Sequence, residues 1–172
     1  MKKLLSAPVV CSFFSVLCAV LLFIKLDISA LFFEMTILHI FLIILSFEDI
    51  KEKMISDKYI LCVLISSIIF RIISFELMNF LNGIITGLVI VLLIILIRKV
   101  FKQNIGLGDM KVLAALSISF GYAGMINVLF CSVIIAMVYG IVMMILKKKN
   151  KHSEIPFVPF VSLGCLLTVL SL

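Results

Sequence analysis

The chain has 172 residues, of which 65% are apolar and only 14% are charged, whereas about half of an ordinary soluble domain is apolar. A membrane-spanning helix needs about 20 apolar residues, so seven such helices would take about 140 positions and leave about 30 for the loops. This composition excludes a disordered chain, a disulfide-stapled chain and an appended soluble domain of useful size. We therefore predict an all-α, polytopic membrane helix bundle that forms a single domain over residues 1–172.

Apolar runs predict about seven membrane spans, within a range of roughly six to eight. The first is expected to be retained rather than cleaved as a signal peptide. Its apolar run is long for a signal core and leads into Lys25 without a small-residue cleavage site. A turn is expected at Gly121–Gly124, between two of the spans. The predicted spans are residues 7–24, 30–47, 59–75, 80–97, 110–121, 124–146 and 155–172.

The net charge of +6 is explained by membrane topology rather than by nucleic-acid binding. With these spans, Lys25 and Arg71 are the only two of the 15 Lys and Arg residues on the side opposite the N-terminus. Because cytoplasmic loops carry an excess of Lys and Arg, we predict a cytoplasmic N-terminus. Glu34 is expected at the outer face, where water can solvate it.

The cysteines and histidines give no sign of a metal site or a cofactor. All five cysteines lie in apolar runs without a C-x-x-C pair, so we expect packed, reduced thiols. His39 lies in mid-span and His152 in a basic loop, neither with a cluster of ligands around it. Gly83 and Gly87 are spaced as G-x-x-x-G, which suits close helix packing either within the chain or in a homo-oligomer. The cysteines are Cys11, Cys18, Cys62, Cys131 and Cys165.

Asp109 follows two glycines and opens an apolar helix, in the sequence Gly106-Leu107-Gly108-Asp109-Met110-Lys111. The glycines permit a tight turn and a close approach by another part of the chain. An ionisable group at the edge of a membrane span is a functional candidate. Asp is also a favoured helix cap, so the local pattern supports both interpretations equally.

Asp49 closes the second predicted span at the same membrane face as Asp109. Taken alone, it is an ordinary solvated acid among mixed charges. Two carboxylates that meet in a sheltered site, however, suit acid–base hydrolysis. Close approach forces their pKa values apart, so one can take a proton from water while the other donates one to a scissile carbonyl.

Three motifs resemble those of the type IV prepilin peptidases, which are membrane aspartyl proteases of the GxGD class. Residues 106–111 match the family motif G-x-G-D-x-K at every fixed position. Residues 49–57 are similar to D-x-R-x-R-x-I-P-N, with Lys51 and Lys53 in place of Arg and Ser56 in place of Pro. Residues 155–160 resemble I-P-F-G-P-F, with Val158 in place of Gly. Together the motifs lie in three separated places, in the family's order.

The resemblance implies that Asp49 and Asp109 are the catalytic pair and that Gly106 and Gly108 let the loop bring Asp109 into place. Lys111 would balance charge or touch substrate, or would simply snorkel to the interface. Lys51 and Lys53 would lie on the substrate side or be structural. Pro156 and Pro159 would shape an irregular helix start or only punctuate the loop.

The resemblance also implies the substrates and the location. Family members cut a short basic leader from prepilins or pseudopilins, just before an apolar helix, at the cytoplasmic face of the bacterial inner membrane. Larger members carry a cytoplasmic methyltransferase domain with paired cysteines. We expect peptidase activity without that domain, because the longest predicted loops have only about a dozen residues. The expected partners are therefore prepilin-like substrates and the lipid bilayer, with no nucleic acid, metal or cofactor.

Three alternatives remain. A presenilin-type or signal-peptide-peptidase-type GxGD protease would cut within the membrane, but this chain has no Pro-Ala-Leu motif. A small proton- or cation-coupled transporter would place its acids deeper in the spans. A non-enzymatic membrane subunit would not need either aspartate.

Overall fold

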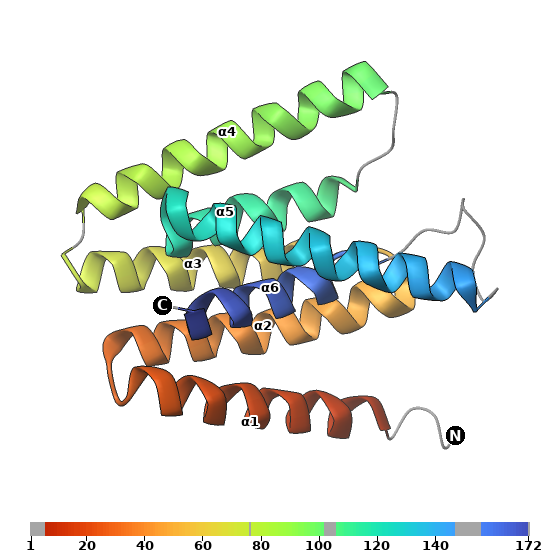
Figure 1. The fold of residues 1–172 in the computed structure, drawn as a ribbon. Helices are drawn as coiled ribbons and strands as arrows, with labels where there is room; N and C mark the ends of the chain where they lie inside the picture. Colours follow the sequence, from red (N-terminus) through yellow and green to blue (C-terminus); the bar gives the residue numbers. More distant parts are fainter. Residues whose placement is uncertain (1–5, 76, 102–105, 147–155, 172) are drawn as a thin grey trace.

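The computed structural model describes residues 6–75, 77–101, 106–146 and 156–171, with the side chains of residues 6–13 and 101 left undescribed. Within these residues all regular structure is helical (Figure 1). Successive helical segments run in opposite directions (Figure 1). The helices are α1 (Ser6–Leu26), α2 (Ala30–Glu52), α3 (Asp57–Ile73), α4 (Leu77–Phe101), α5 (Leu107–Ile145) and α6 (Val158–Ser171).

Helix α5 contains both the fifth and the sixth predicted spans, because it is broken at Gly121 rather than ended there. Gly121 has φ 60° and ψ −167°, a conformation that is almost exclusive to glycine. The helix doubles back on itself in Figure 1. We call residues 107–120 the first arm of α5 and residues 122–145 the second arm. The turn is narrower than the Gly121–Gly124 segment expected from the sequence, since Gly121 is the residue with non-helical angles.

Among the residues that the structure describes, three helices, α2, α4 and α5, are long and apolar enough to cross a membrane. Helix α6 is apolar but has 14 residues, and at 1.5 Å per residue it extends only about 21 Å, against the roughly 30 Å of a bilayer core. These helices make the chain a helical membrane protein. The count of about seven spans and the cytoplasmic N-terminus remain predictions.

Lysine and arginine residues are unevenly divided between the two ends of the bundle. The α2–α3 turn and the starts of the first arm of α5 and of α6 lie at one end, and the α1–α2 turn lies at the other (Figure 1). Lys25 and Arg71 are in the last turns of α1 and α3, toward the end opposite the start of α5. The described basic residues at the end that carries both aspartates are Lys51, Lys53, Lys58, Arg98, Lys99 and Lys111.

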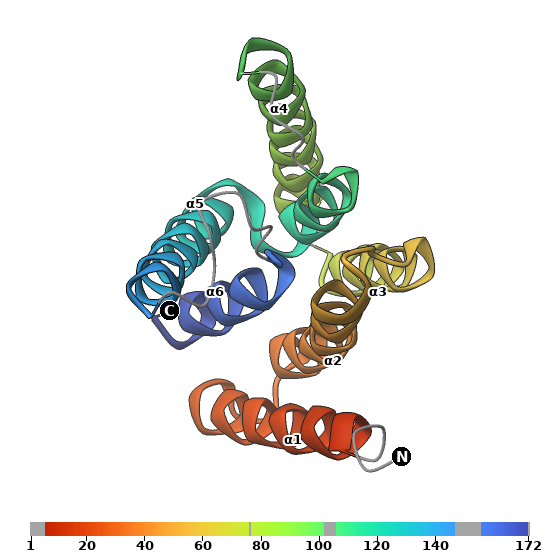
Figure 2. The same ribbon diagram turned by 90° about the vertical axis from the view of Figure 1, so that its right-hand side faces the viewer.

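The core lies where α2, α3, α5 and α6 meet, and includes the fully buried Leu38, Leu42 and Leu116. Helix α4 extends from one side of the bundle, resting on the first arm of α5 (Figure 2). A Cβ on Gly83 would lie 2.7 Å from Ile118 Cα, and one on Gly87 would lie 2.7 Å from Ser117 Oγ. The G-x-x-x-G pattern therefore serves packing within the chain.

The predicted environment of Glu34 is wrong. Its side chain is only 3% exposed, because it lies on the face of α2 that packs into the bundle, together with Met35 and Leu38. His39 is packed, as expected: it is 1% exposed and its Nδ1 lies 2.7 Å from the Met35 carbonyl oxygen.

Candidate active site

Asp49 is directed into the bundle by its place on α2. It follows the buried Leu42, Leu45 and Ser46 at helical spacing and is itself only 7% exposed. Its Oδ2 accepts a hydrogen bond of 3.0 Å from the backbone N–H of Val158, at the start of α6. The first N–H groups of a helix have no partner within the helix, so a carboxylate there is favourable. Asp49 is therefore buried and anchored, rather than an ordinary solvated acid.

Asp109 lies in the first turn of the first arm of α5. The N-cap of that helix is Gly106, which makes no side-chain cap bond, and Asp109 is three residues further on. The interpretation of Asp109 as the cap residue is therefore wrong. Its Oδ2 lies close to Gly106, where a Cβ would be 3.0 Å from this oxygen. The glycine leaves room for the carboxylate to turn back toward the loop.

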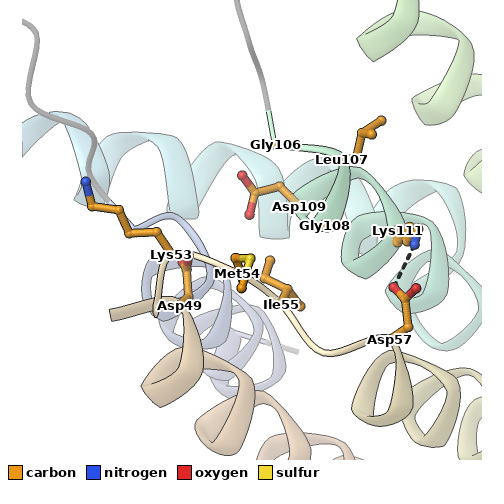
Figure 3. A pocket seen from close by; sticks show the side chains of 10 residues that line it. All are labelled: Asp49, Lys53, Met54, Ile55, Asp57, Gly106, Leu107, Gly108, Asp109 and Lys111. Carbon is orange, nitrogen blue, oxygen red and sulfur yellow. Dashed lines mark hydrogen bonds and ion pairs between the residues drawn. The ribbon is translucent and has the colours of Figure 1, made fainter. Parts of the chain in front are cut away.

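The two aspartates line the same pocket, of about 350 Å³, at the basic end of the bundle. Figure 3 shows them projecting from different helices, with the α2–α3 connection between Lys53 and Ile55 forming a further wall. The lining residues are Asp49, Lys53, Met54, Ile55, Asp57, Gly106, Leu107, Gly108, Asp109 and Lys111. The structure thus brings together the first two sequence motifs.

Both carboxyl groups lie beyond the predicted spans 30–47 and 110–121, and both have perturbed pKa values. Burial first, and the negative charge of Asp49 second, raise the pKa of Asp109 to about 6. Burial also raises the pKa of Asp49, while the N–H groups of Val158 and Phe157 oppose that rise by stabilising the carboxylate. Asp109 can therefore keep a proton up to a pH of about 6 beside Asp49, as one member of a pair of closely spaced carboxyl groups does.

Two of the predicted site residues, Gly108 and Lys53, line the pocket beside this pair, and Lys51 does not. A Cβ on Gly108 would lie 2.8 Å from Ile55 Cδ1, so the glycine allows the α2–α3 connection to approach. Lys53, which is exposed, ends α2 with φ 53° and donates its N–H to the Asp49 carbonyl oxygen. Lys51 is exposed on the last turn of α2 and is not among the described residues that line the pocket.

Comparisons with known proteins point to the same part of the chain. The model of the type IV leader peptidase family matches residues 36–141, more than half of the chain. The chain belongs to this family. It is 25% identical over 127 residues to a "Prepilin leader peptidase/N-methyltransferase" of Aeromonas salmonicida (strain A449) and, to the same extent, to one of Aeromonas salmonicida. Each match covers 72% of this chain and 44% of the relative, so the chain spans less than half of these relatives' length. No solved structure matches the chain.

The region matched to the leader peptidase family includes both aspartates and the Gly106–Lys111 motif, but not the third motif. That third motif is described from Pro156 onward, and Ile155 lies outside the described residues. Pro159 is in the first turn of α6, where a missing N–H costs no helical bond. Residues 156–159 begin α6 at the point where the Val158 N–H donates to Asp49. Pro156 and Pro159 therefore lie close in the chain to the residue that contacts Asp49.

Val158 is the site residue that the sequence did not reveal. It contributes through its backbone, and it is buried with no exposed surface. The Pro156-Phe157-Val158-Pro159 pattern could have located a helix start, since proline is enriched there. It could not have identified the carboxylate that caps this helix, which is 109 positions away in the chain.

Lys111 pairs with Asp57 rather than with Asp109. Its Nζ lies 2.6 Å from Asp57 Oδ1, and both side chains are substantially exposed. Within the described residues no group of three or more His, Cys, Asp or Glu side chains is placed to hold a metal ion.

Proposed function

We propose that the chain is a membrane aspartyl endopeptidase that removes the short basic leader of prepilin-like or pseudopilin-like precursors. The observation that carries this proposal is that Asp49 and Asp109 line one pocket and share a perturbed titration. Membership of the leader peptidase family supports the substrate class. The charge distribution supports a site that opens to the cytoplasm of a bacterial cell, at the inner membrane.

The mechanism follows from the different surroundings of the two carboxyl groups. Asp49 accepts a backbone N–H bond, which favours its ionised form, whereas Asp109 is half-buried beside that charge and retains a proton more readily. Ionised Asp49 would remove a proton from a water molecule, and the resulting hydroxide would attack the scissile carbonyl. Protonated Asp109 would donate its proton to the carbonyl oxygen and so stabilise the tetrahedral intermediate.

Collapse of that intermediate completes the reaction. The carbonyl re-forms, the C–N bond breaks, and the proton now held by Asp49 passes to the leaving amine. As the carbonyl re-forms, one of the two hydroxyl protons of the intermediate returns to Asp109, and the other hydroxyl becomes that of the new carboxyl group, so both residues end as they began. Each carboxyl group thus acts once as an acid and once as a base, without a cofactor.

The position of the pocket suits a substrate that is itself embedded in the membrane. The pocket lies at one end of the bundle, where the apolar parts of α2 and of the first arm of α5 stop. An apolar substrate helix could lie in the bilayer beside the bundle while its leader reaches the two aspartates in water. The lipid bilayer and the substrate are then the partners that this function requires.

The decisive experiment is co-expression of the chain with candidate prepilin-like proteins, followed by gel shift and N-terminal sequencing. Asp49→Asn and Asp109→Asn are each expected to abolish cleavage, since each removes one acid–base group. Asp27→Asn is the matched control, because Asp27 is exposed at the α1–α2 turn and is expected to tolerate the change. Cleavage that persists in either site variant, at equal folded protein in the membrane, would contradict the proposal.

A second set of variants separates this mechanism from thiol and metal proteolysis. Replacement of all five cysteines by Ser is expected to leave cleavage largely intact, and a chelator is expected to have no effect. A strict requirement for one cysteine or for a metal would replace the aspartyl mechanism by another.

A further inference from the structure

The connection between α2 and α3 is attached to both of the helices that carry the aspartates. On the α2 side, Glu48 Oε2 accepts a hydrogen bond of 3.1 Å from the backbone N–H of Ser56. The Lys53 N–H is bonded to the Asp49 carbonyl oxygen at 3.1 Å. The connection is therefore folded back onto the last turns of α2, next to Asp49.

On the other side, the same connection contacts the start of α5 at two points. Ile55 packs against Gly108, where no side chain intervenes. Asp57, the first residue of α3, forms the 2.6 Å ion pair with Lys111, which is two residues after Asp109. Figure 3 shows this ion pair at the pocket edge, with Met54 and Ile55 on the connection between it and Asp49.

We propose that Asp57 and Lys111 form a positioning pair that holds the α2–α3 connection against the Gly106–Asp109 turn and thereby sets the spacing of Asp49 and Asp109. This inference rests on the proposed peptidase function. Neither residue touches the reacting atoms. Their pairing determines how closely the start of α3 approaches the start of α5 at the pocket. The two residues are 54 positions apart in the chain.

The pair acts by placement because its bond strength alone is small. The side chains are 48% and 72% exposed, and an exposed ion pair is weak and is screened by salt. Catalytic groups must nevertheless be held to within about 0.5 Å of the productive geometry. A modest change in the fraction of molecules whose α2–α3 connection is correctly placed against α5 therefore changes kcat directly.

The first test is a double-mutant cycle on purified protein in detergent, with a prepilin-like substrate. Asp57→Asn and Lys111→Met are each expected to lower kcat about two- to fivefold with little change in KM, which is the range for one exposed ion pair. The double variant should be no slower than either single variant, because the same interaction is lost. Lys111→Arg should stay near the wild-type rate. Lys58→Met, an exposed lysine beside Asp57, is the matched control.

Salt provides a second readout that a general structural defect would not give. Wild-type kcat should fall toward that of the variants as salt is raised to about 1 M, where the Debye length is only about 3 Å. The variants should respond much less. Multiplicative losses in the double variant, or a rise in KM confined to Lys111→Met, would overturn the proposal, the latter because it would place Lys111 on the substrate.

A third readout does not depend on activity. Met54→Cys and Leu107→Cys, two exposed positions on opposite sides of the pocket, can be joined by a short bifunctional thiol reagent in a chain whose native cysteines are Ser. Loss of the ion pair should slow this cross-linking, and an unchanged rate in Asp57→Asn and Lys111→Met would refute the positioning role. If the wild-type chain cleaves no prepilin-like substrate, the proposed function fails while this measurement still decides the positioning.

Discussion

Gly108→Ala is the substitution whose effect can be worked most directly from the structure. The new Cβ would lie 2.8 Å from Ile55 Cδ1 and 2.9 Å from Ile55 Cβ, whereas ordinary van der Waals contact begins at 3.4 Å. The differences, 3.4 − 2.8 = 0.6 Å and 3.4 − 2.9 = 0.5 Å, are the displacements that the contact requires. Rotation can move Cδ1, but Ile55 Cβ is fixed to the backbone, so the connection or the Asp109 turn must shift by about 0.5 Å.

The expected consequence is a loss of activity larger than the loss of stability. A misplacement of about 1 Å costs about a hundredfold in rate, so about half of that distance is expected to cost roughly tenfold in kcat. Overpacking of this kind destabilises by about 1–3 kcal/mol. Both effects are measurable on purified protein, the first by prepilin cleavage and the second by thermal unfolding in detergent.

Ile55→Gly provides the compensating change, because it removes Cβ, Cγ1 and Cδ1, the three atoms that a Cβ on residue 108 would meet. The double variant Gly108→Ala, Ile55→Gly should therefore recover part of the lost rate. Gly124→Ala is the control near the start of the second arm, where the nearest atom to a new Cβ is Phe120 Cβ at 3.2 Å. Full activity of Gly108→Ala, or no recovery in the double variant, would refute the reasoning.

Three further outcomes are expected. Gly121→Ala should lower the free energy of unfolding by about 1–3 kcal/mol through backbone strain alone, since nothing lies within 4 Å of its Cβ position. An unchanged midpoint of thermal unfolding would argue against the helix break at this residue. Arg71→Met should destabilise by about 1.5–3 kcal/mol or more in the same assay, because the Arg71 guanidinium donates to the carbonyl oxygens of Ile118 and Ser119; Arg71→Lys should lose less. Wild-type cleavage should decline as pH rises through about 6, where Asp109 loses the proton that the mechanism needs. In the Asp49→Asn variant, carboxyl NMR should show a lower Asp109 pKa that still exceeds 3.8, because burial is the larger cause of the raised pKa. An unchanged Asp109 pKa would show that the two groups do not interact.

The sequence alone was sufficient to predict the class of protein and the approximate positions of its helices. It was also sufficient to select Asp49 and Asp109 as candidate site residues. These properties depend on local information. Apolar runs determine which segments are helical in a membrane, and the glycines that flank Asp109 are neighbours of the residue whose turn they permit. The break at Gly121 was foreseen for the same reason, although its width was not.

The tertiary structure decided which partner each polar group has. Asp49 meets the N–H of Val158, Lys111 meets Asp57 rather than Asp109, and Glu34 is buried where solvation was expected. The spacing of residues along one helix shows which side chains share a face, but not which other helix that face will meet. These contacts join segments 54 to 109 positions apart, so they exist only once α2, α3, α5 and α6 have packed.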